Sequence, residues 1–248
     1  LLASSAASDV YKRQSMDYSN FKIDMPNDVE FIINTIKSHG HQAYAVGGCV
    51  RDSIMGLTPN DWDITTSALP SDIKEYFNKT IDTGIEHGTV TVMLHNVGYE
   101  VTTYRIDGEY KDGRHPSSVE FSDRLTDDLC RRDFTINAMA YNNITGLVDE
   151  YGGIDDINNR IIKCVGNPIE RFTEDALRMM RAIRFSAQLG FTIEPDTFKA
   201  IEKLNRNIDK VSMERVCVEL KKTLLSDNPD YCSLYATTGL FNNILPVI

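Results

Sequence analysis

A short segment near residue 50 restricts what this chain can fold into more than any other feature. Residues 42–46 are typical of a strand, Gly47 and Gly48 of a turn, and residues 50–55, which include Arg51, of a short helix. A glycine pair lets backbone N–H groups approach a phosphate closely, and a helix N-terminus adds donors and a favourable dipole. The segment therefore predicts a phosphate-binding turn between a strand and a helix.

Two aspartates, Asp61 and Asp63, follow this turn in a segment that is typical of a strand over residues 62–66. Side chains alternate along a strand, so both carboxylates are expected on one face, where they can hold a divalent metal. Each feature alone has a plain structural explanation, a turn or a solvated strand end. Their ordered combination favours a site for nucleotidyl transfer, which needs a triphosphate cradle and a metal.

The composition excludes several classes of protein. The chain has 248 residues, enough for one large domain or two small ones, and no apolar run approaches the ~20 residues that cross a membrane. Its five cysteines are scattered and lack C-x-x-C spacing, which argues against disulfides or zinc and suits a reducing cytoplasm. The net charge of −10 argues against indiscriminate RNA binding but permits a local basic patch.

The pattern changes along the chain. Residues 1–15 lack any hydrophobic period and are interpreted as a non-native or disordered tail. Residues 16–150 alternate between helix and strand patterns, which predicts an α+β region, whereas residues 151–248 predict an all-helical region. The chain stops soon after an apolar run without a terminating signal, so we expect it to be truncated.

Further candidate site residues lie in both regions. Glu100 is on the second strand of a hairpin, with strands over 89–94 and 100–105 and a turn at 96–98, and offers a third carboxylate that binds metal or activates a hydroxyl. Asp107 is a weaker candidate for that role. Arg132 can neutralise phosphate charge and Asp133 can accept a hydrogen bond from a ribose, although a surface ion-pair cluster is the plain alternative.

A helix predicted over residues 173–189, with Thr173 as its N-cap, places Asp175 and Arg178 on one face. The plain interpretation is an intrahelical ion pair. The functional one is a base reader, because cytosine and adenine both present an amine donor beside a ring-nitrogen acceptor. Uracil and guanine would leave both protein groups unpaired. Arg181 and Arg184 continue at three-residue steps toward the triphosphate, although Arg184 is also consistent with packing alone.

Together these segments resemble the nucleotidyltransferase superfamily of the DNA polymerase beta type. They are most similar to its tRNA branch, the class II CCA-adding enzymes and bacterial poly(A) polymerases. The resemblance covers about residues 40–248, and its motifs are GG-x-VRD, D-x-D, E-x-T-x-x-R, RRDFT-x-N-A and E-D-x-x-R, at residues 47–52, 61–63, 100–105, 131–138 and 174–178.

The resemblance implies a polymerase-beta-like head with a small mixed or antiparallel sheet, a helical neck, and a C-terminal body and tail beyond this chain. It implies that Asp61, Asp63 and Glu100 are catalytic and that Asp61 and Asp63 hold Mg²⁺. The implied reaction adds C, C and A from CTP and ATP to the 3′ end of tRNA. Gly47, Gly48, Arg51 and the six residues discussed above are then nucleotide contacts (Arg132, Asp133, Asp175, Arg178, Arg181 and Arg184).

Several alternatives stay open. An A-adding enzyme keeps the polar loop present at residues 107–116, a CC-adding enzyme lacks it, and a poly(A) polymerase usually has a basic run where residues 82–89 stand. A non-catalytic nucleotide- or RNA-binding module is the alternative of another class, and intact Asp61, Asp63 and Glu100 argue against it. The sequence gives no indication of oligomeric state.

Overall fold

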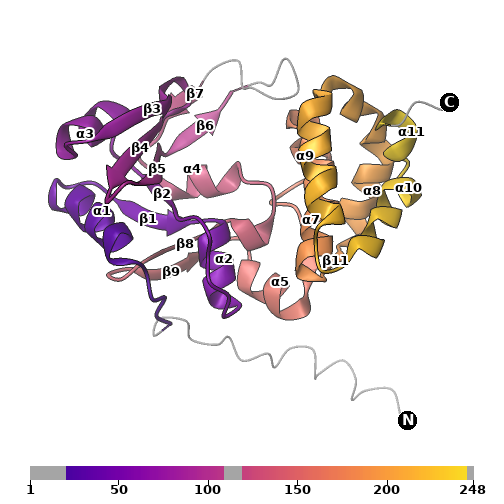
Figure 1. Ribbon diagram of the computed structural model, residues 1–248, viewed down its shortest axis with the longest axis horizontal. Coiled ribbons are helices and arrows are strands. Elements are labelled where there is room, and N and C mark those ends of the chain that lie inside the picture. The colour runs from indigo at the N-terminus through magenta and orange to yellow at the C-terminus, as the bar shows by residue number, and fades with distance from the viewer. Residues whose placement is uncertain (1–20, 109–118, 245–248) are drawn as a thin grey trace, which may run out of the picture.

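The computed structural model describes residues 21–108 and 119–244 (Figure 1). The expected N-terminal tail and most of the polar loop at 107–116 lie outside the described residues. A sheet-containing region and a helical region lie side by side, and α4 and α5 lie between them in Figure 1. No helix in the described ranges is long and apolar enough to cross a membrane.

One mixed sheet of seven strands forms the centre of the first region, in the order β3-β4-β5-β2-β1-β8-β9. All neighbours are antiparallel except β2 and β5, which run parallel. The sheet is therefore mixed, as expected, but not small. The strands are β1 Ala43–Val46, β2 Asp63–Thr66, β3 Thr80–Gly84, β4 Thr89–Leu94, β5 Val97–Thr103, β8 Met139–Asn142 and β9 Gly146–Asp149.

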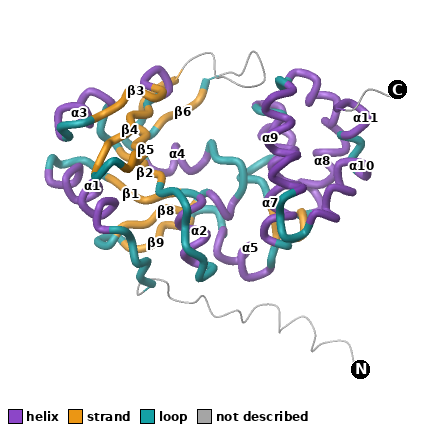
Figure 2. Tube along the Cα trace, in the orientation of Figure 1, coloured by secondary structure: helices purple, strands orange, loops and turns teal. Residues whose placement is uncertain are grey.

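Helices cover both faces of this sheet (Figure 2). Along β1, Ala43 and Ala45 belong to the main hydrophobic core, whereas Tyr44 and Val46 belong to a smaller cluster with Leu129. This alternation separates α1, which packs in the main core, from α4, which carries Leu129. The elements of this region outside the sheet are α1 Asn27–Ser38, α2 Gly48–Ile54, α3 Pro70–Tyr76, α4 Leu125–Cys130 and the paired short strands β6 Arg105–Asp107 and β7 Val119–Phe121.

The turn between β4 and β5 was predicted at residues 96–98, but it lies at residues 95–96. Leu94 pairs with Val97, so His95 and Asn96 form the turn, both with positive φ (49° and 64°). Two residues in the left-handed region are the mark of a type I′ turn, which suits the twist of a hairpin. Val97 and Gly98, predicted as turn residues, pair within the sheet instead.

The second region is mainly helical but not entirely so. Two short strands, β10 Ile161–Ile162 and β11 Thr192–Ile193, pair in parallel, which corrects the expectation of an all-helical continuation. The helices are α5 Gly153–Asn159, α6 Pro168–Glu174, α7 Leu177–Leu189, α8 Pro195–Leu204, α9 Met213–Leu224, α10 Ser233–Thr237 and α11 Phe241–Ile244.

The single helix predicted over residues 173–189 is wrong, because α6 and α7 replace it. Asn167 caps α6 by accepting from the Ile169 N–H, and Thr173 lies inside that helix rather than at its cap. The break is at Asp175, whose φ of −138° and ψ of 105° are extended. The Asp175 carboxylate accepts from the Leu177 N–H at 3.0 Å, and this local bond competes with helix continuation.

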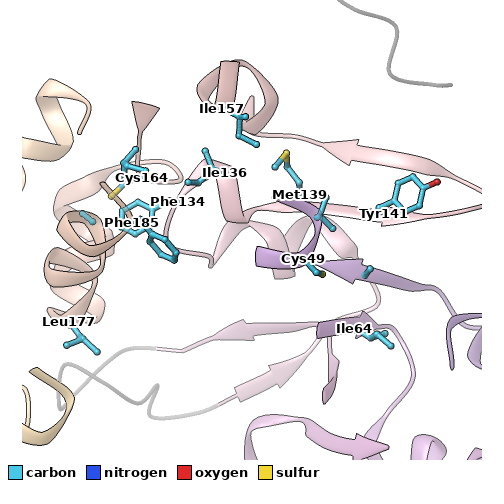
Figure 3. Packing of buried hydrophobic residues seen from close by; sticks show 14 of the residues in the cluster. Cys49, Ile64, Phe134, Ile136, Met139, Tyr141, Ile157, Cys164, Leu177 and Phe185 are labelled. Atoms are coloured by element: carbon cyan, nitrogen blue, oxygen red, sulfur yellow. The ribbon is translucent and has the colours of Figure 1, made fainter. Parts of the chain in front are cut away.

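Apolar packing joins the two regions. Phe134, which precedes β8, and Phe185 of α7 lie edge to face with ring centroids 5.8 Å apart and an interplanar angle of 81° (Figure 3). One hydrophobic cluster includes Ile64 from the sheet and Met180 from α7. The head and neck therefore share a continuous core rather than meeting only through a linker.

Candidate active site

Asp63 and Glu100 come together because of the parallel pairing of β2 with β5. Ile64 pairs with Val101, so the residues before them, Asp63 and Glu100, are neighbours on one face of the sheet. Asp61 lies in the loop before β2 rather than in a strand, which differs from the expected alternation. Burial raises the pKa of Asp63, and the charges of Glu100 and Asp61 raise it further against the opposing effect of Arg132. Glu100 and Asp61 are therefore both close enough to repel Asp63.

These carboxylates line an open pocket of about 650 Å³. Neither the glycine turn nor Arg132 lines it, so the pocket marks the carboxylate edge of the site rather than the whole site. No group of three or more His, Cys, Asp or Glu within the described part of the chain is arranged to hold a metal by itself. Asp61, Asp63 and Glu100 also form no ion pair with a lysine, arginine or histidine of that part. Among the described residues, the only opposing charge that lowers the pKa of Asp63 is that of Arg132, which forms no direct ion pair with it.

The glycine turn is built as its sequence requires. Gly47 has φ 83° and ψ −130°, a conformation open to glycine only, and it precedes α2, which begins at Gly48. A Cβ on Gly47 would lie 3.1 Å from Nη1 of Arg132. The Gly47 N–H donates to the Met139 carbonyl at 3.1 Å, so the donors that remain for a phosphate come after it. The turn therefore brings backbone and an arginine together.

Arg132 lies between the turn and the carboxylates. Its Nη2 donates to Asp128 at 3.0 Å, and its charge lowers the pKa of Asp63. Its Nε is buried and has no hydrogen-bond partner in the described residues. Arg132 thus places a cation beside the glycine turn, and its Nε–H donor has no partner among the described residues.

Arg51 also lies beside the glycine turn, since a Cβ on Gly48 would be 3.7 Å from its Nη2. It is buried, its Nε donates to Asp52 at 2.8 Å, and its Nη1 donates to Oδ1 of Asn137 at 2.7 Å. Its guanidinium carbon also lies 5.1 Å from the centre of the Phe185 ring in α7. Arg51 therefore joins the two regions, and its contact with a nucleotide stays a prediction.

Asp133 has protein partners, and its predicted contact with a ribose stays a prediction. Its Oδ2 accepts from Nε and Nη2 of Arg181 at 2.8 and 2.5 Å, and its Oδ1 accepts from Asn137 at 3.2 Å. Burial would raise the pKa of Asp133, but the charge of Arg181 outweighs it and lowers the pKa to about 2. Asp133 and Arg181 therefore form a salt bridge across the head–neck boundary.

Asp175 and Arg178 do not share a helix face, since Asp175 precedes α7. Asp175 accepts from Nη2 of Arg215 in α9 at 3.1 Å. Arg178 donates from Nη1 to Glu174 at 2.7 Å and from Nη2 to the Arg131 carbonyl at 2.9 Å. The plain interpretation, an ion pair between Asp175 and Arg178, is therefore not found. Each has another partner, and Arg178 reaches the segment that carries Arg132.

Arg184 lies in the interior of the neck. It is 7% exposed, its Nε donates to Glu219, and its Nη1 donates to Gln188 at 2.7 Å. Its guanidinium carbon lies 3.9 Å from the centre of the Phe185 ring. This placement favours the packing interpretation of Arg184 over a triphosphate contact.

Sequence reasoning missed three residues that organise these side chains. Asp128 precedes Arg131 and Arg132 by three and four positions, a spacing that brings them together at a helix end. Phe185 and Arg215 carry no such local signal, because their partners are distant in sequence. Only the fold reveals them.

Two family models match the chain. The model described as "Poly A polymerase head domain" matches residues 43–163, and that described as "Probable RNA and SrmB- binding site of polymerase A" matches residues 190–248. Together they cover most of the described chain.

Several known proteins similar to this chain are named CCA-adding enzymes. The CCA-adding enzyme of Ligilactobacillus salivarius is 49% identical over 218 residues, covering 83% of this chain and 54% of that protein. The crystal structure of the Bacillus stearothermophilus CCA-adding enzyme in complex with CTP aligns with a TM-score of 0.79 and 45% identity, over 85% of this chain and 51% of that one. The Thermotoga maritima CCA-adding enzyme complexed with tRNA-CCA aligns with a TM-score of 0.73 and 26% identity, over 89% of this chain and 52% of that one. The chain thus spans about half the length of these relatives.

Proposed function

We propose that this chain, which belongs to the family of CCA-adding enzymes and poly(A) polymerases and has their head and neck fold, adds C, C and A from CTP and ATP to tRNA 3′ ends. The observation that supports this best is the register of β2 and β5, which sets Asp63 beside Glu100 and near Asp61. A carboxylate group that forms no direct ion pair with the described residues suits metal-assisted nucleotidyl transfer.

Asp61 and Asp63 would hold Mg²⁺. Their oxygen ligands suit this ion. Burial and then the charges of Glu100 and Asp61 raise the pKa of Asp63, and a cation would offset both effects. Bound Mg²⁺ would supply electrostatic stabilisation of the charge that develops on the phosphate oxygens. In this proposal Glu100 orients the attacking 3′-hydroxyl or accepts its proton, and Arg132, with the N–H groups after Gly47, neutralises the triphosphate.

Asp175 and Arg178 would read the base. A carboxylate has about four acceptor positions and a guanidinium five donors, so neither residue is saturated by its protein partners. The Nε–H of Arg178 has no partner among the described residues, and Asp175 is held beside the cation of Arg215. Asp175 can then accept from the amine of cytosine or adenine while Arg178 donates to the adjacent ring nitrogen.

The remaining residues expected at the nucleotide receive a different role in this proposal. The side chains of Arg51, Asp133, Arg181 and Arg184 are engaged by protein partners. We propose that they align the triphosphate end of the site, which is in the head, with the base reader, which is in the neck. The cytoplasm is the proposed location, since the five cysteines are all free, as suits a reducing compartment.

The activity is tested by incubating the chain with tRNAs ending in -N, -NC and -NCC and with each nucleotide separately. A CCA-adding enzyme extends all three, the first two with CTP and the third with ATP. An A-adding enzyme extends only the -NCC substrate, a CC-adding enzyme only the first two, and a poly(A) polymerase adds long A tails. Binding of CTP without extension of any substrate would favour the non-catalytic module and contradict the proposal.

A further inference from the structure

Asp128 of α4 is a charged residue in the interior of the head without an assigned function. Its exposed fraction is 0%. Burying a carboxylate is costly unless charged or hydrogen-bonding partners compensate for lost water. The partners of Asp128 therefore indicate why the residue is there.

The Asp128 carboxylate forms ion pairs with two arginines. Its Oδ1 accepts from Nε and Nη2 of Arg131 at 3.0 and 2.6 Å, and its Oδ2 accepts from Nη2 of Arg132 at 3.0 Å. Oδ2 also accepts from the Thr65 hydroxyl at 3.1 Å. Burial would raise the pKa of Asp128, but the charges of Arg132 and Arg131 outweigh it and lower the pKa. The carboxylate is thus ionised at neutral pH.

This contact determines where the guanidinium of Arg132 points. Asp128 holds Nη2, while Nη1 lies close to Gly47 and Nε is buried without a partner among the described residues. A buried donor without a partner is costly, so an external acceptor at this place would be favourable. The Nη1 donor, which Asp128 does not use, is thus placed at the glycine turn.

The contact also joins Arg132 to the strand of the catalytic carboxylates. Thr65 lies two residues after Asp63 in β2 and is fully buried. Thr65 and Arg132 donate to the same oxygen of Asp128, so Asp128 fixes the position of the Arg132 guanidinium relative to β2. Asp128 itself lies away from the pocket that Asp63 and Glu100 line.

We propose that Asp128 is a positioning residue that aims Arg132 at the triphosphate of the incoming nucleotide, without touching the nucleotide. The inference rests on the proposed function, which makes Arg132 a triphosphate contact. Its rival is a purely structural role, in which Asp128 only fastens α4 to β2. The two differ in what happens to anion affinity in molecules that remain folded.

The test compares wild type with Asp128→Asn by titrating inorganic tripolyphosphate, CTP and UTP. Asparagine keeps the shape and loses the charge, so tripolyphosphate and CTP are expected to bind at least about tenfold more weakly. The ratio of the affinities for CTP and UTP should stay within about twofold, because Asp175 and Arg178 are unchanged. Thermal melting reports the folded fraction, by which the affinities are corrected.

Thr65→Val provides a milder variant in case Asp128→Asn does not fold. It removes one neutral hydrogen bond from Oδ2 and is expected to weaken tripolyphosphate binding about two- to fivefold. Asp72→Ala is the matched control, since it removes the carboxylate that accepts from the Leu69 N–H at the start of α3 and so destabilises the head elsewhere. It should leave tripolyphosphate affinity unchanged.

The inference would be overturned if Asp128→Asn and Thr65→Val both bound tripolyphosphate as tightly as wild type after correction for folding. That result would leave the proposed activity untouched. If Asp128→Asn does not fold, a wild-type tripolyphosphate affinity of Thr65→Val alone would overturn the inference. If tripolyphosphate binding depends on Asp128 but the wild-type chain extends no tRNA, the activity would be overturned and the inference supported.

Discussion

The acids of the candidate active site and the arginines of α7 differ in how their charge is compensated. In the head, Asp63 is repelled by Glu100 and Asp61, and none of the three acids forms a direct ion pair with the described residues. In the neck, the arginines of α7 are matched with acids, as Arg181 is with Asp133 and Arg184 with Glu219. Unmatched charge on the head is suited to binding a cation and substrate. Matched charge in the neck is suited to holding a geometry.

The difference assigns separate tasks to residues of the same type. Arg132 in the head has a buried donor without a partner among the described residues. Arg184 in the neck instead donates to the Glu219 carboxylate and the Gln188 amide and packs against the Phe185 ring. An arginine meant for a substrate must retain donors, but an arginine meant for structure must satisfy them. Counting arginines along α7 therefore overestimates how many contact a nucleotide.

The largest expected effect is loss of the unmatched head charge. Asp63→Ala should reduce nucleotide incorporation about a thousandfold or more, because metal assistance contributes several kcal/mol to the transition state. Single-turnover extension of tRNA with CTP and Mg²⁺ measures it. Asp82→Ala is the control, as Asp82 pairs only with Lys74 on the edge of the sheet. A wild-type rate for Asp63→Ala would refute the metal assignment.

Next in size is the loss of base choice. The double variant Asp175→Ala, Arg178→Ala should lose most of its preference for CTP and ATP over UTP and GTP, a change of about a hundredfold, because each unpaired buried group costs ~1–3 kcal/mol. Competition between labelled nucleotides measures the preference. The exposed ion pair of Asp196 and Lys199 in α8, mutated together to alanine, is the control. Retained preference at a near-normal rate would show that base choice lies elsewhere.

A smaller effect concerns the bridge between the regions. Because the pKa of Asp133 is lowered from 3.8 to about 2, its ionised form stabilises the folded protein at pH values above about 4. Asp133→Asn should therefore lower the free energy of unfolding by about 2 kcal/mol at pH 7, and the deficit should shrink as pH falls from about 4 toward 2. Urea unfolding across this range tests the sign. A deficit independent of pH would exclude the salt bridge as its source.

The smallest expected effect is at the aromatic contact. Phe185→Leu removes an edge-to-face pair with Phe134 and the ring beneath three arginines, and should lower the free energy of unfolding by about 1 kcal/mol. Phe31→Leu is the matched control, because Phe31 pairs with Phe77 at 6.4 Å but is 54% exposed. Equal losses for the two variants would mean that the head–neck joint does not depend on this ring.

Some parts of the site were predictable because they are local. The strand, glycine turn and helix around Gly47 follow from residues adjacent in sequence, and the structure has them there. The convergence of Asp63 and Glu100 was expected from the family resemblance and requires the parallel pairing of two strands. The helix through Asp175 was predicted wrongly, because a periodic pattern does not reveal that a side chain will cap the next helix.

What the sequence determined by itself are therefore the short-range elements and the chemical types at the candidate site: a glycine turn, acidic residues and arginines. Tertiary structure alone decided which of these charges have partners within the protein and which keep unpaired groups. Arg51, Asp133 and Arg181 differ from Arg132 in their partners, and those partners come from other elements of the fold. The reason is physical, because a charged side chain pairs with the groups that the fold brings within a few ångströms of it. The separation of two residues along the sequence does not predict that distance.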